Sequence, residues 1–267
     1  MKISVNGNDL ELINILDTNY KDEMLSWRNQ EFVRKNMRNP EIISIESHRA
    51  YLDSLKSGKR EVLLFLINGN PEAVINIDVD KENKVIENGM YLINEEQLNS
   101  GIGVAAVWMR YNYIFNKYPE YELYSYILEH NTKNISLHKK LGEIEVGMLP
   151  VKKADGETEN QVKFVMVSSI WDKQKERVEK MVNLIMRNEF VMDKKNKLIK
   201  IFENLFNVTA KEAVMINKEN NGDWNSIMHL EIITEIEKTF EIELTREEML
   251  KLNSFDAALE LVSRRNK

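Results

Sequence analysis

The chain has 267 residues, a formal net charge of −6 and no cysteine. This length allows two domains, the acidic charge argues against a general nucleic-acid binder, and the missing cysteine excludes disulfides, thiolate metal sites and a cysteine nucleophile. No apolar run approaches the roughly 20 residues of a membrane span, and the first seven residues lack the apolar centre of a signal peptide. We therefore expect a cytoplasmic protein without membrane contact, in which any thiol chemistry uses a borrowed thiol.

Strand and helix patterns alternate over the first 170 residues. The Asn6-Gly7 pair predicts a hairpin turn between two opening strands, because Asn-Gly supplies the positive φ angles that a two-residue turn needs. Apolar periodicity assigns the other elements. Helices are predicted at 21–37, 45–55, 101–115 and 132–141, strands at 2–5, 10–15, 62–67, 73–77, 84–93, 123–128, 144–149 and 162–168, and a hairpin tip at 153–157. This pattern predicts one α/β unit.

The rest of the chain predicts helices alone. Residues 173–187 keep apolar side chains at helical spacing and predict a connecting helix, and Met192-Asp193-Lys194-Lys195-Asn196 indicates a linker. Four helices are predicted after it, at 197–206, 226–240, 246–250 and 254–262. The sequence therefore predicts an α/β domain at 1–170, a connecting helix and linker at 171–193, and an all-α four-helix domain at 194–267.

A glycine turn precedes the predicted helix at 101–115. Within Leu98-Asn99-Ser100-Gly101-Ile102-Gly103-Val104, such a turn can aim free backbone N–H groups at a phosphate. We predict this phosphate contact at Gly101, Ile102, Gly103 and Val104. No metal site is predicted, because the four histidines of the chain share no ligand spacing.

A second motif follows on the next strand and helix, Asn131-Thr132-Lys133-Asn134-Ile135-Ser136-Leu137-His138-Lys139-Lys140-Leu141-Gly142. Together with the glycine turn it resembles the signature of the GNAT acyltransferase superfamily. The resemblance implies an α+β domain with a mixed, mostly antiparallel central sheet flanked by helices. It also implies that the turn binds the pyrophosphate of coenzyme A, acetyl-CoA or another acyl-CoA, that Leu92 and Ile93 hydrogen-bond the pantetheine, and that Asn131 belongs to the same site.

His138 occupies the place where the family has a tyrosine near the departing sulfur. The resemblance implies that His138 donates a proton to the thiolate, which its unperturbed pKa of about 6.5 permits near working pH. The alternative is a structural or solvated histidine. Two further departures from the family pattern are Leu98, where Gln or Arg is usual, and Glu143, where an aromatic residue follows the Leu-Gly pair.

Aminolysis of a thioester also needs a base for the amine and a donor for the carbonyl oxygen. A backbone N–H on the strand segment Met90–Ile93 could polarise the carbonyl. Glu87 and Glu129 lie on strands beside the expected cleft and are the candidate bases, acting directly or through water. Each could instead be an ordinary surface charge, and the sequence does not choose between them.

Three upstream segments narrow the resemblance: Trp27-Arg28-Asn29, Arg38-Asn39-Pro40 and Ile43-Ser44-Ile45-Glu46-Ser47-His48. They are similar to the amino-sugar branch of the superfamily, which contains the N-acetyltransferase of pseudaminic acid biosynthesis. The resemblance implies that Arg28, Asn29 and His48 face a nucleotide-linked amino sugar. The alternative is that Arg28 makes a surface ion pair and that His48 lies on the surface of a helix.

The segment Asp223-Trp224-Asn225-Ser226-Ile227 opens the predicted helix at 226–240. It resembles the attachment signature of acyl and peptidyl carrier proteins, with Asn in place of Asp and Ile in place of Leu around the serine. The resemblance implies a carrier-protein domain with 4′-phosphopantetheine bound covalently to Ser226, added by a phosphopantetheinyl transferase. Eight acidic and two basic residues lie between Asp223 and Glu248, and partners of a carrier recognise such a face electrostatically.

Helix capping is the alternative explanation of this segment. Asn225 or Ser226 is a good N-cap residue for a helix whose apolar stripe is predicted at Ile227, Leu230, Ile233, Ile236 and Phe240. A capping serine would need no chemistry.

Three functional classes remain open at this stage. The first is an N-acyltransferase that moves an acyl group from coenzyme A or a carrier to a primary amine, with a nucleotide-linked amino sugar as the expected small-molecule partner. The second is an S-acyl loader, in which the first domain acylates the arm on Ser226, and the third is a non-catalytic scaffold with a working carrier. An acyl-activating enzyme is a further candidate partner. A short linker gives the arm a high effective concentration near the cleft, unless it is too short to reach.

Overall fold

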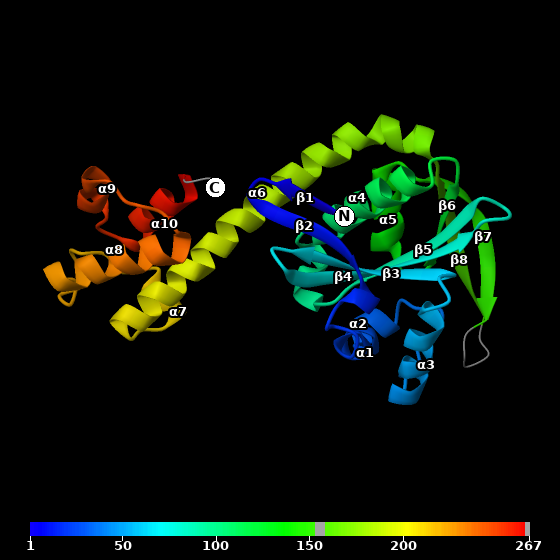
Figure 1. Cartoon of the computed structure of the whole chain (residues 1–267), viewed down its shortest axis with the longest axis horizontal. Coiled ribbons are helices and arrows are strands. Elements are labelled where there is room, and N and C mark those ends of the chain that lie inside the picture. The colour runs from blue at the N-terminus through cyan, green and yellow to red at the C-terminus, as the bar shows by residue number, and fades with distance from the viewer. Residues whose placement is uncertain (153–157, 265–267) are drawn as a thin grey trace. The chain divides into compact units, whose positions relative to one another are not determined.

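The computed structural model describes residues 1–152 and 158–264, with the side chains of 188–190 left out. The predicted hairpin tip at 153–157 therefore lies outside the described residues. The chain divides into two compact units, Met1–Ile185 and Met186–Lys267, which we call the sheet unit and the helical unit (Figure 1). No helix in the described part of the chain is both long and apolar enough to cross a membrane.

The sheet unit contains one eight-stranded sheet in the order β1-β2-β3-β4-β5-β6-β8-β7. Its strands are β1 (Lys2–Val5), β2 (Asn8–Asn14), β3 (Arg60–Ile67), β4 (Asn70–Asp80), β5 (Val85–Leu92), β6 (Glu122–Leu128), β7 (Ile144–Lys152) and β8 (Thr158–Met166). Neighbours are antiparallel except for β5 and β6, which run parallel. The prediction of a mixed, mostly antiparallel sheet with flanking helices is confirmed.

Helices cover both faces of this sheet (Figure 1). One face carries α1 (Glu23–Asn29), α2 (Glu31–Arg34) and α3 (Ile45–Leu55), and the other carries α4 (Ile102–Lys117) and α5 (Thr132–Leu141). Two 3₁₀ turns, η1 (Ile15–Asp17) and η2 (Glu95–Asn99), follow β2 and β5.

Strand β3 shows why the sheet lies in the middle. Its residues from Val62 to Ile67 are all buried, as expected for a strand covered on both faces. Val62, Leu64 and Leu66 pack in a cluster with Met24 of α1 and Leu55 of α3. Because side chains alternate along a strand, the residues between them face α4, whose Ala105 to Asn112 are buried throughout.

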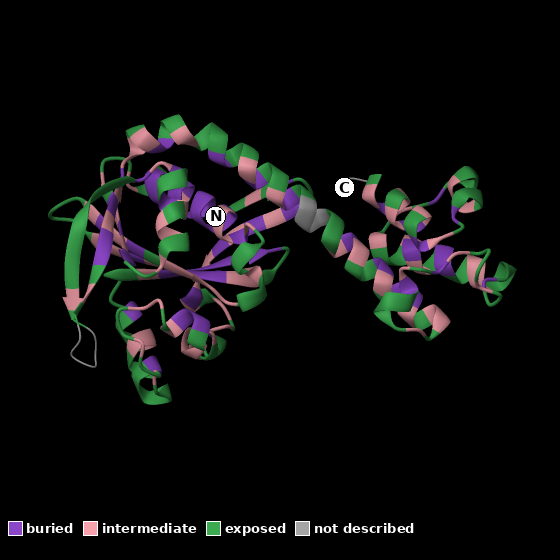
Figure 2. Cartoon of the chain, turned by 180° about the vertical axis from the view of Figure 1, so that it is seen from behind, coloured by how far each residue is buried: buried purple, intermediate pink, exposed green. Residues whose placement is uncertain are grey.

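The edge strand β7 differs from the rest of the sheet. It is coloured as exposed along almost its whole length in Figure 2, and its pairing with β8 shifts by one residue between Glu145 and Gly147. Such a bulge bends and twists an edge strand.

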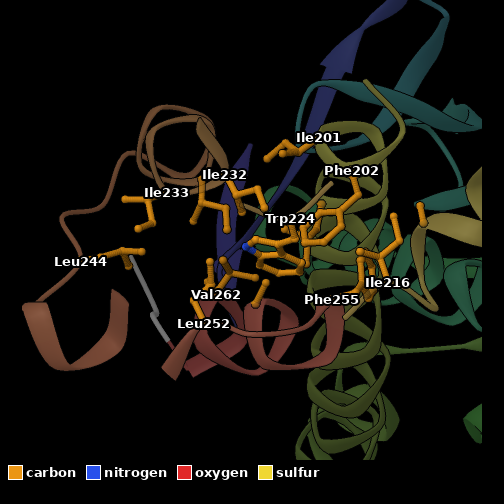
Figure 3. Packing of buried hydrophobic residues seen from close by; sticks show 14 residues of the cluster. Ile201, Phe202, Ile216, Trp224, Ile232, Ile233, Leu244, Leu252, Phe255 and Val262 are labelled. Atoms are coloured by element: carbon orange, nitrogen blue, oxygen red, sulfur yellow. The ribbon is translucent and has the colours of Figure 1, made fainter. Parts of the chain in front are cut away.

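The helical unit comprises the last part of α6 (Ser168–Phe206) with α7 (Ala210–Ala213), α8 (Ser226–Phe240), α9 (Arg246–Lys251) and α10 (Phe255–Arg264). The predicted helix at 226–240 has the observed bounds. Its core gathers around Phe202, Trp224 and Phe255, whose rings meet edge to face (Figure 3). The helical prediction for this part of the chain is confirmed at the level of secondary structure.

Two details of the helical prediction were wrong. The expected linker at 192–196 lies inside α6, because it contains no Gly or Pro and its Asp193 pairs with Lys197 one turn later at 2.8 Å. The apolar stripe of α8 was also misplaced: Ile227 and Leu230 are 70% and 62% exposed, while Ile232 lies in the core.

Candidate active site and carrier segment

The parallel strands β5 and β6 separate part-way along their length. Their pairing ends at Asn88 and Ser125, although β5 continues to Leu92 and β6 to Leu128. The amide of Asn88 lies at this point, where its Nδ2 donates to the carbonyl of Tyr124 at 2.8 Å and to Oγ of Ser125 at 3.1 Å. The sheet is therefore open beyond Asn88, at the carboxyl ends of two parallel strands.

A pocket of about 370 Å³ lies beside this opening, on the face of the sheet that α1 and α3 cover. Most of the residues that line it are polar. The polar lining residues are Arg28, Asn36, Arg38, Asn39, His48, Tyr51, Arg60, Asn76, Asp78, Glu87, Asn88, Tyr91, Tyr126 and Gln161. The apolar ones are Met24, Met37, Ile43 and Leu128, with Gly89 between them.

Both carboxylates of the pocket are paired with arginines. Glu87 Oε1 lies 2.9 Å from Nη2 of Arg38, and Asp78 accepts two hydrogen bonds from Arg60, at 2.5 and 2.7 Å. Arg38 also donates from Nε to Gln161 at 3.1 Å. Since a third arginine lines the pocket, its lining carries a net positive charge.

That third arginine is Arg28, which was predicted to contact the acceptor. Its Nη2 donates to the carbonyl of Asn39 at 2.7 Å, while Nη1 is buried without a hydrogen-bond partner among the described residues. Burial lowers the pKa of the Arg28 guanidinium. Within the described part of the chain Arg28 makes no ion pair, so the alternative of a surface ion pair was wrong.

His48 and Asn29, the other two predicted acceptor residues, have different positions. His48 lines the pocket and is 4% exposed, and its Nε2–H donates to the carbonyl of Lys21 at 2.7 Å. The alternative of a histidine on the helix surface was therefore wrong. Asn29 does not line the pocket: its side chain accepts from the N–H of Ile43 and donates to the carbonyl of Ile43, both at 2.9 Å, and so holds the loop that carries Arg38.

Only one of the two candidate bases lies in the pocket. Glu87 faces it from β5. Glu129 is exposed at the end of β6 and accepts a hydrogen bond from Asn160 at 3.1 Å, but it is not part of the pocket lining. The geometry thus favours Glu87 over Glu129.

The ladder between β4 and β5 decides which backbone groups face the opening. Ile93 donates its N–H to Glu72 at 3.1 Å and its carbonyl accepts from Gln30 at 2.8 Å, so both of its groups are occupied. Because antiparallel hydrogen bonding alternates along a strand, the N–H groups of Met90 and Leu92 point to the open edge. The predicted pantetheine contact fits Leu92, and the prediction for Ile93 is corrected to Met90.

The glycine turn precedes α4 as predicted, after η2. Gly101 is the N-cap with a φ of +92°, and no side chain caps this helix. A Cβ on Gly101 would come within 2.9 Å of Ile185, whereas one on Gly103 would meet nothing within 4 Å. Ile102 donates its N–H to Oγ of Ser100 at 3.1 Å, and Val104 donates its N–H to the carbonyl of Gly101 at 2.8 Å. The N–H groups of Gly101 and Gly103 have no partner among the described residues, and free N–H groups at a helix start can bind a phosphate.

The other two predicted residues of the donor site lie on α5. Asn131 is its N-cap, with Oδ1 accepting from the N–H of Asn134 at 3.3 Å. His138 is only 5% exposed and lies 2.7 Å from the carboxylate of Glu143. It does not line the pocket, so the structure does not bring it together with Arg28, His48 and Glu87.

Ser226 lies in the helical unit as the first residue of α8, and it is exposed. The N-cap is Asn225, whose Oδ1 accepts from the N–H groups of Ile227 and Met228 at 2.9 and 3.1 Å. The hydroxyl of Ser226 makes no hydrogen bond within the described residues. Capping therefore explains Asn225 and leaves Ser226 unexplained.

Sequence reasoning missed several pocket residues, chiefly Asn88, Tyr51 and Gln161. The Glu87-Asn88-Gly89 run was a usable signal, since polar residues and a glycine inside a strand often mark a close approach of a ligand or another chain. No local signal marks Gln161.

No cluster of His, Asp and Glu that could hold a metal ion is found in the described ranges.

Solved acetyltransferase structures share the architecture described above. A protein from T. thermophilus, described as an acetyltransferase, is 17% identical with a TM-score of 0.54, over 67% of this chain and 96% of that one. The aminoglycoside acetyltransferase AAC(6')-Ib, solved with coenzyme A, is 17% identical with a TM-score of 0.53, over 62% and 99%. An uncharacterised protein from Bacillus halodurans reaches 0.56 at 15% identity, over 68% and 97%.

At these identities the likeness establishes the fold alone. The sheet unit has the same fold as these acetyltransferases. No protein-family model and no curated protein matches the chain.

Proposed function

We propose that the sheet unit is an N-acyltransferase, which moves an acyl group from a pantetheine thioester to a primary amine. The observation that carries this proposal is the opening between β5 and β6, which has free backbone donors on one strand and an arginine-rich pocket beside it. The acetyltransferase fold supports it, and AAC(6')-Ib is a neighbour of that fold solved with coenzyme A and with kanamycin.

On the donor side, the uncapped start of α4 would hold the pyrophosphate of coenzyme A. The proposed residues are Gly101, Ile102, Gly103 and Val104; the N–H groups of Gly101 and Gly103 have no partner among the described residues, while Ile102 would exchange its bond to Oγ of Ser100 for the phosphate. The N–H groups of Met90 and Leu92 would contact the pantetheine and polarise the thioester carbonyl. Asn131 would close the site from the start of α5.

On the acceptor side, the pocket would hold the amine. Its volume of about 370 Å³ is in the range of small-molecule sites, and its positive lining suits an acceptor with an anionic group. A nucleotide-linked amino sugar meets both conditions, with Arg28 and His48 facing it and Asn29 holding the loop behind them.

Glu87 would serve as the general base, directly or through a water molecule. Its ion pair with Arg38, at 2.9 Å, holds the carboxylate at the pocket. The amine loses its proton to Glu87 as it attacks the carbonyl carbon, and the carbon–sulfur bond then breaks. The leaving sulfur needs a proton, for which His138 is the proposed donor.

For the helical unit we propose a carrier-protein domain at residues 194–267, with 4′-phosphopantetheine on Ser226 added by a phosphopantetheinyl transferase. The exposed serine with no hydrogen-bond partner in the described ranges fits this attachment, because its hydroxyl is free to attack a phosphate. When bound, the arm supplies a thiol that carries the acyl group. The exposed Ile227 and Leu230 beside it offer apolar contacts to partner enzymes.

The same free serine also supports a second candidate, an S-acyl loader that acylates its own arm for another enzyme.

Incubating the full chain with acetyl-CoA and a panel of amines, with thiol release as the readout, tests the N-acyltransferase. Transfer to an amino-sugar nucleotide by both wild type and Ser226→Ala supports coenzyme A as the donor. Transfer that Ser226→Ala abolishes makes the arm the donor, and acyl groups found only on Ser226 favour the loader. No transfer to any amine contradicts the proposal.

A further inference from the structure

A buried polar cluster lies outside the pocket, between α4, α5 and β8. Glu143, just after the glycine that ends α5, has a side chain with no exposed surface, and its Oε1 lies 2.7 Å from Nδ1 of His138. Its carboxylate also accepts a hydrogen bond from the hydroxyl of Tyr111 on α4. Arg110 stands beside them, with its guanidinium 5.1 Å from the centre of the Tyr111 ring.

This cluster joins two departures from the GNAT pattern. His138 stands in place of a tyrosine and Glu143 in place of an aromatic residue, five positions apart in the sequence. A buried carboxylate at Glu143 is costly without basic partners, and Arg110 and His138 are the basic side chains that act on it. The contact at 2.7 Å is the one with His138.

Electrostatics favours the ionised carboxylate. Burial alone would raise the pKa of Glu143, but His138, Arg110 and Tyr111 together lower it. Burial raises the pKa of Tyr111, which stays a hydrogen-bond donor. Nδ1 of His138 is buried and faces the Glu143 carboxylate at 2.7 Å without the geometry of a hydrogen bond, and this contact fixes the orientation of the imidazole. Nε2 of His138 makes no hydrogen bond within the described residues and is not fully buried, so it is the nitrogen that a ligand can reach.

The position of His138 relates this cluster to the strand opening. Its ring lies over Phe164 of β8, with 5.6 Å between the ring centres. Phe164 is paired with Ser125, and Ser125 with Asn88, where the opening begins. Neighbouring strands lie about 4.8 Å apart. Phe164 on β8 is therefore two strand spacings, roughly 10 Å, from Asn88 on β5, where the opening begins. His138 approaches it from the face opposite the pocket.

We infer that His138 and Glu143 form an acid dyad for the leaving sulfur, with Glu143 as a positioning residue that acts through His138. This inference rests on the proposed function. As the carbon–nitrogen bond forms and the carbon–sulfur bond breaks, the sulfur takes the proton of Nε2, and Glu87 on the other face holds the proton of the amine. Solvent then restores the proton of His138 and removes that of Glu87, so the cycle is balanced.

The decisive variant is Glu143→Gln, which keeps the shape of the side chain and removes its charge. Its matched control is Glu145→Gln on β7, where the half-exposed carboxylate pairs with Lys139 at 2.7 Å. With acetyl-CoA as donor, we expect Glu143→Gln to lower kcat about 10- to 100-fold with little change in KM. Glu145→Gln should match wild type.

A second readout needs no acceptor. A hydrogen bond from Nε2 of His138 to the bound sulfur should make wild type prefer coenzyme A over desulfo-coenzyme A by about tenfold, and Glu143→Gln should lose this preference. Tyr111→Phe removes one hydrogen bond from the Glu143 carboxylate and should partly weaken the preference for coenzyme A. This second variant tests the dyad if Glu143→Gln does not fold.

The outcomes separate the two proposals. Wild type that binds coenzyme A but acylates no amine contradicts the proposed function, while its preference for the thiol still decides on the dyad. Variants that keep both the wild-type kcat and the thiol preference would overturn the dyad and leave the acyltransferase standing. Wild type that does not bind coenzyme A contradicts both.

Discussion

The first backbone N–H groups of a helix have no partner within the helix, and α4 and α8 differ in how these groups are satisfied. At the start of α4, the N-cap Gly101 takes a left-handed conformation and has no side chain, and the N–H groups of Gly101 and Gly103 have no partner among the described residues, whereas Ile102 donates to Oγ of Ser100. At the start of α8, the side chain of Asn225 takes up the N–H groups of Ile227 and Met228, and the hydroxyl of Ser226 stays free instead.

This difference matches the two ways in which a pantetheine can be held. Free N–H groups bind a phosphate reversibly, which suits a diffusing coenzyme A at α4. A free hydroxyl on a capped helix can be linked to a phosphate covalently, which suits a carrier arm at α8. Under the proposed function, the capping residue would distinguish a site that binds a phosphate from a site that is linked to one.

The largest expected effect concerns α4. Gly101→Ala forces a left-handed conformation on a residue with a Cβ, which costs roughly 1–2 kcal/mol, and brings that Cβ within 2.9 Å of Ile185. We expect the affinity for coenzyme A, measured by calorimetry, to fall at least tenfold because the turn must move.

Gly58→Ala is the matched control for Gly101→Ala. Gly58 also has a positive φ, of +72°, but a Cβ there would meet nothing within 4 Å. It should lower thermal stability and leave coenzyme A binding unchanged. Equal affinities in the two variants would contradict a phosphate site at α4.

The next effect separates the two candidate bases. Glu87→Gln should lower kcat by about 100-fold, within the usual contribution of a general base, because Glu87 lines the pocket beside Arg38. Glu129→Gln, an exposed residue outside the pocket, should retain the wild-type rate. A steady-state assay with acetyl-CoA measures kcat of both variants. Comparable losses of kcat in Glu87→Gln and Glu129→Gln would contradict Glu87 as the base.

At the start of α8, the capping residue can be changed without touching Ser226. Asn225→Ala should destabilise the helical unit by about 1 kcal/mol, whereas Asn225→Asp should keep the cap and add the charge typical of carrier proteins. Chemical denaturation measures the first effect, and the rate of phosphopantetheine transfer the second. A faster rate for Asn225→Ala than for Asn225→Asp would contradict a carrier role for this segment.

The smallest effect is a pH dependence near Ser226. His229 accepts a hydrogen bond from Trp224 at 3.1 Å and donates one to the carbonyl of Met249 at 3.0 Å, so its neutral form fits the fold. Burial, with Lys218, lowers the pKa of His229.

The unfolded chain therefore binds a proton first as the pH falls below about 6.5. The melting temperature of the helical unit should decline from that pH toward the folded pKa and be flat above it. His229→Gln should remove this decline, and a melting temperature that rises on acidification would contradict the assignment.

Local patterns predicted much of the fold, and long-range geometry accounts for what they missed. The helix at 226–240 and the glycine turn follow from neighbouring residues alone. The occupied backbone of Ile93 depends on the phase of the β4–β5 ladder, and the Arg38–Glu87 and His138–Glu143 pairs depend on how elements pack. The linker at 192–196 was misjudged because its charges suggested solvent, although nothing in it interrupts a helix.

The central claim is that one chain combines an acyltransferase fold with a pantetheine attachment site. It is tested most directly by the intact mass of the full chain after incubation with coenzyme A and a broad-specificity phosphopantetheinyl transferase, with Ser226→Ala as the control. The account predicts one added phosphopantetheine on wild type, on the peptide that contains Ser226, and none on the variant. An unmodified wild type, or the same added mass on Ser226→Ala, would contradict it.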